Sequence, residues 1–154
     1  MLSDEINSDG HNVNDLNDML SGLRVMLPSA QLLTAFLLTL PFNMGFAQVV
    51  QSQKWTFLAT FLCSLTSLVM LSAPAIQHRL MRPLQNRVKF KQFATREILI
   101  GSLMLSLALI LGTHLVTAEV FGDPVDNILT AFVASLIVVL WWLLPTILKA
   151  QQRM

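Results

Sequence analysis

The sequence predicts an all-α integral membrane protein built as a four-helix bundle. Long uncharged stretches divide the chain, 54% of its residues are hydrophobic, and only 12% are charged. A helix needs about 20 apolar residues to cross a hydrocarbon core about 30 Å thick, and each stretch reaches that length. As a helix, each stretch also satisfies its own backbone hydrogen bonds away from water. We therefore expect membrane spans at about residues 26–48, 55–77, 98–118 and 127–148.

The segment before the first span is expected to contain two short elements. Residues 1–12 are polar and are predicted to be a flexible leader. Apolar side chains then recur at three- and four-residue spacing, which predicts a short amphipathic N-terminal helix over about residues 13–23, lying on the membrane or on the bundle. The leader is acidic, whereas a cleavable signal peptide begins with basic residues, so we expect the whole chain to remain.

The first span carries polar residues that would be costly against lipid. Gln31 and Thr34 lie three residues apart on one face, and Asn43 follows nearer the end of the span. All three are candidate intramembrane polar contacts, and we expect Gln31 and Thr34 to bond to a neighbouring helix. Pro41 in the first span and Pro74 in the second are expected to kink their helices, since each removes a helix hydrogen bond.

Small and hydroxyl residues form stripes along the other spans. Such residues let membrane helices approach closely, so the stripes predict inward, helix-contacting faces. A stripe that lines a water path is the alternative, although hydroxyls in membrane helices also bond to their own backbone. His114, near the outer end of the third span, is interpreted as a bonded or interfacial histidine and as a further candidate contact. The stripes comprise Thr56, Thr60, Ser64 and Ser67, then Ser102, Ser106, Thr113 and Thr117, then Ala131, Ala134 and Ser135.

Positive charge indicates how the chain is threaded. Nine of the ten basic residues fall in regions that an even number of spans places on one side, and Lys54 alone falls on the other. Basic residues in short loops stay cytoplasmic. The opposite connection, residues 119–126, is acidic. We therefore expect a bacterial inner-membrane protein with both termini cytoplasmic, including the short tail 149–154.

Charged residues gather at the predicted cytoplasmic ends of the spans. Arg24 precedes the first span, His78 and Arg79 end the second, and Glu97 begins the third. These residues are the candidate site for an anion, a lipid headgroup or a partner; the alternative is a set of solvated helix-end charges. The basic segment Arg79–Arg96 suits anionic lipid headgroups, and its other interpretation is a topology signal alone.

The chain lacks the patterns that carry common chemistries. It contains no nucleotide-binding or zinc-binding motif, and its single cysteine, Cys63, excludes an intrachain disulfide or a thiol pair. His78 and His114 fall at different depths, so they cannot share one haem within a subunit. We expect no enzyme activity, no cofactor, no metal and no nucleic-acid partner. A proton-coupled transporter normally needs an embedded carboxylate, and none falls within the predicted spans.

Several stretches resemble a known family. They are residues 22–31 (GLRVMLPSAQ), residues 34–42 (TAFLLTLPF), residues 73–79 (APAIQHR) and Phe121-Gly122. Over about residues 15–148 the chain resembles a bacterial family of small four-span membrane proteins of unestablished function, whose members are often labelled sodium/proton antiporters. The resemblance implies the four-span fold and brings no functional residues with it. We therefore expect a non-enzymatic membrane protein, oligomeric or an accessory subunit of a larger complex; the alternative is a small cation/proton transporter.

Overall fold

The computed structural model describes residues 2–80, 87–122 and 124–151, with side chains described from Ser21 onward except for residues 78, 81–89 and 91. Within these ranges every regular element is helical, which confirms the all-α prediction. The elements are α1 (Leu2–Thr39), the short 3₁₀ helices η1 (Leu40–Phe42) and η2 (Met44–Gln48), α2 (Gln51–Leu80), α3 (Arg87–Phe121), α4 (Val125–Ile137), the π-helical segment η3 (Val138–Leu143) and α5 (Leu144–Gln151).

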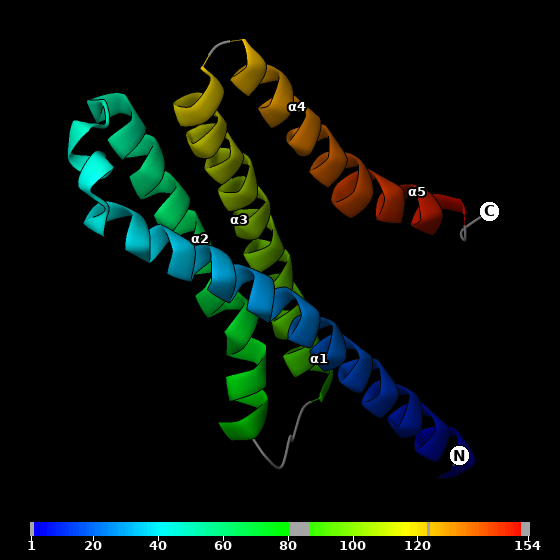
Figure 1. The fold of residues 1–154 in the computed structure, drawn as a ribbon. Coiled ribbons are helices and arrows are strands. Elements are labelled where there is room, and N and C mark those ends of the chain that lie inside the picture. The colour runs from blue at the N-terminus through cyan, green and yellow to red at the C-terminus, as the bar shows by residue number, and fades with distance from the viewer. Residues whose placement is uncertain (1, 81–86, 123, 152–154) are drawn as a thin grey trace.

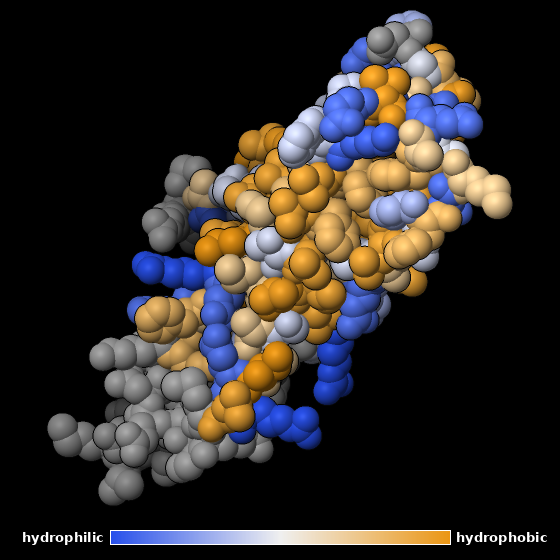
Figure 2. Space-filling model, turned by 90° about the vertical axis from the view of Figure 1, so that its left-hand side faces the viewer, coloured by the Kyte–Doolittle hydropathy of each residue, from blue (hydrophilic) through white to orange (hydrophobic). Residues whose placement is uncertain are grey.

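Four segments of the described chain are long and apolar enough to cross a membrane. Their mean hydropathy lies between 1.6 and 2.3, which confirms the predicted number of spans by length and composition. Figure 2 shows a broad hydrophobic band across the middle of the molecule, with hydrophilic side chains toward its two ends. The segments are Ser21–Phe42, Gln51–Gln77, Gln92–Phe121 and Val125–Gln151.

The helices form a three-helix body from which the last span diverges. α2 and α3 run side by side in opposite directions, and α1 crosses them diagonally (Figure 1). Gly122 has a positive φ of 65°, the left-handed conformation that commonly ends a helix, and the chain turns there into α4. Among the described elements outside its own span, α4 packs against α3 alone. Within the described residues α4 therefore does not pack on α1 or α2, and the four-helix bundle stays a prediction.

The N-terminal part differs from the sequence-based prediction. α1 is one continuous helix from Leu2 to Thr39, so residues 13–23 do not form a separate helix and the backbone of residues 2–12 is helical. At its other end, α1 stops two residues before Pro41 and gives way to η1 and η2, although the first span was expected to continue to residue 48. A proline disfavours helical geometry in the residue before it, so Pro41 ends the helix instead of kinking it.

The hydrophobic core lies among α1, α2 and α3, where Leu23 and Ala30 of α1 meet Leu71 of α2 and Leu105 of α3. Gly101 on α3 faces the fully buried Leu71 so closely that a Cβ atom at this glycine would lie 2.9 Å from the Leu71 Cγ. The hydroxyl residues Thr60, Ser64 and Ser67 are each fully buried, which confirms the packing interpretation of the second span. For the fourth span the same prediction is wrong in the single chain, because Ala131 and Ser135 are exposed on the diverging α4.

Candidate functional site

A hydroxyl pair joins the first two spans inside the membrane region. Thr34 is buried on α1, and its Oγ1 lies 2.7 Å from the Oγ of the fully buried Ser64 on α2. Thr34 Oγ1 also donates a hydrogen bond to the carbonyl of Ala30 at 2.8 Å. Because a hydroxyl has a single proton, Ser64 is then the donor in the hydrogen bond between the two hydroxyls. Thr34 thus bonds to a neighbouring helix, as the sequence predicted.

The other polar residues of the first span do not join this contact. Gln31 is exposed on α1. Three residues turn a helix by about 300°, so a side chain three positions from a buried residue can lie beyond the edge of the contact. Asn43 is exposed as well, and it caps the junction of η1 and η2: its N–H donates to Leu40 and its carbonyl accepts from Phe46. Both side chains are exposed in the chain, and the interpretation of Gln31 and Asn43 as intramembrane polar contacts stays a prediction.

The residues predicted to cluster at the basic end of the spans are only partly brought together. Arg24 and Arg79 are exposed. The side chain of His78 lies outside the described part of the structure, as do most of the side chains between Arg79 and Arg96. Glu97 is half-buried between α2 and α3, where its Oε1 accepts a 2.7 Å hydrogen bond from Gln77 Nε2. Its other oxygen, Oε2, is buried without a hydrogen-bond partner among the described residues. The glutamine that holds Glu97 was not singled out from the sequence.

A second polar cluster lies at the opposite end, between α3 and the start of α4. Asp126 is 2% exposed, and one carboxylate oxygen, Oδ2, lies 2.7 Å from His114 Nδ1. The other oxygen, Oδ1, accepts hydrogen bonds from the hydroxyls of Thr117 and, at 3.2 Å, Thr130. We call these residues the His–Asp cluster: His114, Thr117, Asp126 and Thr130.

The sequence placed Asp126 in the acidic connection, whereas the structure places it buried in the first turn of α4. α4 begins at Val125, so Asp126 occupies its first turn, where the helix dipole favours a negative charge. The turn at Gly122 is short enough to lay that carboxylate against the last turns of α3. A usable signal was present, since Pro124 followed by an acidic residue within the next turn is typical of a helix start.

The cluster can do two things chemically. Its hydrogen bonds fasten the base of α4 to α3, a structural role. The carboxylate can also share a proton with the imidazole, whose side chain is 43% exposed and hence open to the surroundings. Among the described residues no three His, Cys, Asp or Glu side chains converge as metal ligands.

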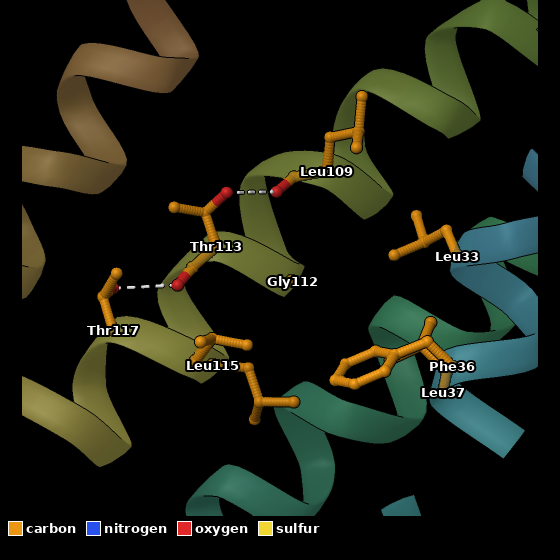
Figure 3. A pocket seen from close by; sticks show the side chains of 9 residues that line it. Leu33, Phe36, Leu37, Leu109, Gly112, Thr113, Leu115 and Thr117 are labelled. Carbon is orange, nitrogen blue, oxygen red and sulfur yellow. Dashed lines mark hydrogen bonds between the residues drawn. The ribbon is translucent and has the colours of Figure 1, made fainter. Parts of the chain in front are cut away.

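An apolar groove separates α1 from α3 in the half of the molecule near the His–Asp cluster. It encloses about 340 Å³ between Leu33, Phe36 and Leu37 on α1 and the turns of α3 around Gly112 (Figure 3). Thr113 faces it, but its hydroxyl donates to the Leu109 carbonyl at 2.8 Å. This hydroxyl bonds to its own backbone, which favours the packing interpretation of the third span over a water path.

The apolar helices, the hydrophobic band and the buried interhelical polar contacts define a multi-pass α-helical membrane protein. The chain belongs to a family of unknown function, DUF6328, whose model matches residues 11–145. No curated protein and no solved structure matches the chain. Membership of an uncharacterised family is therefore confirmed, whereas the bacterial origin and the antiporter label stay predictions.

Proposed function

We propose that the protein is a non-enzymatic, four-span component of a bacterial inner membrane, with both termini cytoplasmic, that works as a homo-oligomer assembled through α1. The observation that carries this proposal is the exposure of Gln31. This residue lies at the midpoint of the first span, Ser21–Phe42, and its side chain is exposed in the single chain.

An amide at that depth needs a hydrogen-bonding partner. Lipid tails offer none, and a polar group without a partner in an apolar medium costs several kcal/mol. The single chain does not bury Gln31, so a second copy is the simplest source of a partner. In a two-fold arrangement the same residue of each copy meets its equivalent, and an amide can both donate and accept.

The surface around Gln31 suits a helix–helix contact. Pro28, Ala35 and Leu38 are exposed at offsets of minus three, plus four and plus seven, which places them on the same face of α1. Ala35 is small, and small residues next to a hydrogen-bonding side chain are typical of interfaces between membrane helices. The diverging α4 leaves this face uncovered.

Cross-linking in native membranes tests the proposal. In a background with Cys63→Ser, an Ala35→Cys variant is expected to form a disulfide-linked dimer under mild oxidation. Adding Gln31→Leu is expected to reduce that dimer severalfold, Gln31→Asn to retain much of it, and Gln48→Leu to leave it unchanged, because Gln48 is an exposed amide in η2 away from mid-span. Equal dimer yields with Gln31→Leu and Gln48→Leu would refute assembly through this amide.

Cation/proton transport is the second candidate, favoured by the His–Asp cluster. Asp126 supplies a buried carboxylate within the fourth span, and His114 offers it a proton-exchanging neighbour. Purified protein in liposomes with an internal pH dye provides the test. A sodium-dependent proton flux that Asp126→Asn abolishes and Glu119→Gln preserves would establish transport over a purely structural role, since Glu119 is an exposed carboxylate on the same side. The absence of flux in the unmodified protein would remove this candidate.

A further inference from the structure

A second groove lies between the three-helix body and the last part of the chain. It encloses about 450 Å³ and is lined by Met26 of α1, Leu99 and Ser102 of α3, and, across from them, Trp141, Trp142 and Lys149. Ligand pockets typically enclose about 300–1,000 Å³, so the volume suits a sizeable ligand. Because the groove lies between apolar spans, we expect lipid to have access to it.

The shape of the diverging span produces this groove. Pro145 has no N–H to donate to the carbonyl of Trp141, one helical turn back, and the chain before it winds as the π helix η3. A π segment changes the direction of the side chains that follow an α-helix, and such segments are frequent at functional sites. Both tryptophans belong to η3, and both line the groove.

Charge distinguishes this groove from the one near the His–Asp cluster. Lys149 lines it directly, whereas Arg24 and Arg96 belong to the basic end without lining the groove. Both arginines are exposed, and none of the described residues that line the groove is acidic. The groove therefore combines apolar walls with one lining cation, Lys149.

We propose that this groove binds an anionic phospholipid from the leaflet at the basic end. One acyl chain lies along Met26 and Leu99 against the tryptophans, and the phosphate meets Lys149. Tryptophan favours the boundary between headgroups and acyl chains, where its apolar ring and its N–H are both accommodated. This site is independent of the α1 face proposed for self-assembly, since Gln31 does not line it.

Fluorescence quenching by brominated lipid provides the test. The full chain, with Trp55→Phe so that only the η3 tryptophans report, is reconstituted in phosphatidylcholine containing a small fraction of brominated phosphatidylglycerol or, separately, brominated phosphatidylcholine. We expect the anionic lipid to quench several times more strongly at equal mole fraction. A basic residue near the surface contributes enough attraction for about a fivefold preference, so Lys149→Gln is expected to lower the ratio by roughly that factor. Lys149→Arg is expected to retain it.

The matched control is Arg79→Gln, an exposed cation on α2 at the same end that does not line the groove. Circular dichroism of each variant verifies that the helices are intact. Equal quenching by the two brominated lipids would overturn the proposal, and so would equal losses for Lys149→Gln and Arg79→Gln, because general surface charge would then explain the preference. Soluble glycerol phosphate is expected not to compete; competition would show that the site binds phosphate without lipid. If a second copy covered the groove, neither brominated lipid would quench the tryptophan fluorescence. This outcome too would refute lipid binding in the groove.

Discussion

Replacing Gly101 by alanine is expected to force α2 and α3 apart. The new Cβ atom would lie 2.9 Å from Leu71 Cγ, 3.0 Å from its Cδ2 and 3.3 Å from its backbone nitrogen. Ordinary van der Waals contact begins near 3.4 Å, so the helices must separate by about half an ångström or Leu71 must move. Leu71 is fully buried, and its backbone nitrogen is part of α2, so it has little room to adjust.

The magnitude follows from two opposing effects. Adding a methyl group to a packed core typically costs about 1–3 kcal/mol, while alanine is favoured over glycine within a helix by about 1 kcal/mol. Gly112→Ala is the matched control on the same helix, because its Cβ would lie 3.6 Å from Thr60 Cγ2, an ordinary contact. The helix preference is common to both variants. The difference between their unfolding free energies should therefore isolate the packing cost of about 1–3 kcal/mol.

Unfolding in mixed micelles of a mild detergent and sodium dodecyl sulfate, followed by circular dichroism, provides the assay. We expect Gly101→Ala to unfold at a lower dodecyl sulfate fraction than the wild type and Gly112→Ala at the same or a higher fraction. The double variant Gly101→Ala, Leu71→Ala is expected to be less destabilised than the sum of the two single changes, since the smaller side chain makes room for the methyl group. Identical transitions for Gly101→Ala and Gly112→Ala would refute the close approach of the two helices.

Three further predictions use the buried polar contacts. A double-mutant cycle with Thr34→Ala and Ser64→Ala should give a coupling of about 0.6–2 kcal/mol in the same unfolding assay; additive effects would show that the hydroxyls do not interact. Gln77→Ala should destabilise the protein by about 1–3 kcal/mol, because Glu97 Oε1 loses its partner, and a second change of Glu97→Gln should recover part of that loss; no recovery would contradict the contact. Pro145→Ala should restore regular α-helical hydrogen bonding across η3, seen as slower amide exchange in that segment; unchanged exchange would mean that proline does not cause the π segment.

The spans were predictable because the bilayer acts on composition and length. A run of about 20 uncharged residues needs hydrocarbon around it whatever the rest of the chain does, and the helix satisfies its own backbone. The same local reasoning identified Thr34, since a polar side chain within a span seeks a partner. It did not decide whether the partner of Gln31 lies within the chain, because the spacing of two residues shows that they are near each other on a helix, not where the edge of the helix–helix contact falls.

The polar contacts between helices could not be predicted from local composition. Glu97 was noticed as a helix-end charge, but its partner Gln77 comes from another helix, and only the register of α2 against α3 selects it. Asp126 looked like a residue of the connection because the uncharged stretch begins after it. Its burial depends on the tight turn at Gly122, which lays the first turn of α4 against His114 and Thr117.

The amino-acid sequence by itself determined that this protein is helical, has four helices long and apolar enough to cross a membrane and contains close-packing hydroxyl stripes, because each of these properties follows from local composition. Only the tertiary structure decided that α4 leaves the body, that Asp126 is buried beside His114, and that Trp141, Trp142 and Lys149 face a groove. Lipid is as apolar as the side chains of the spans, so burial of apolar surface does not by itself bring one span against another. Their arrangement depends on a few close contacts, the turn at Gly122 and the proline at position 145, whose effects appear only when the helices are placed in space.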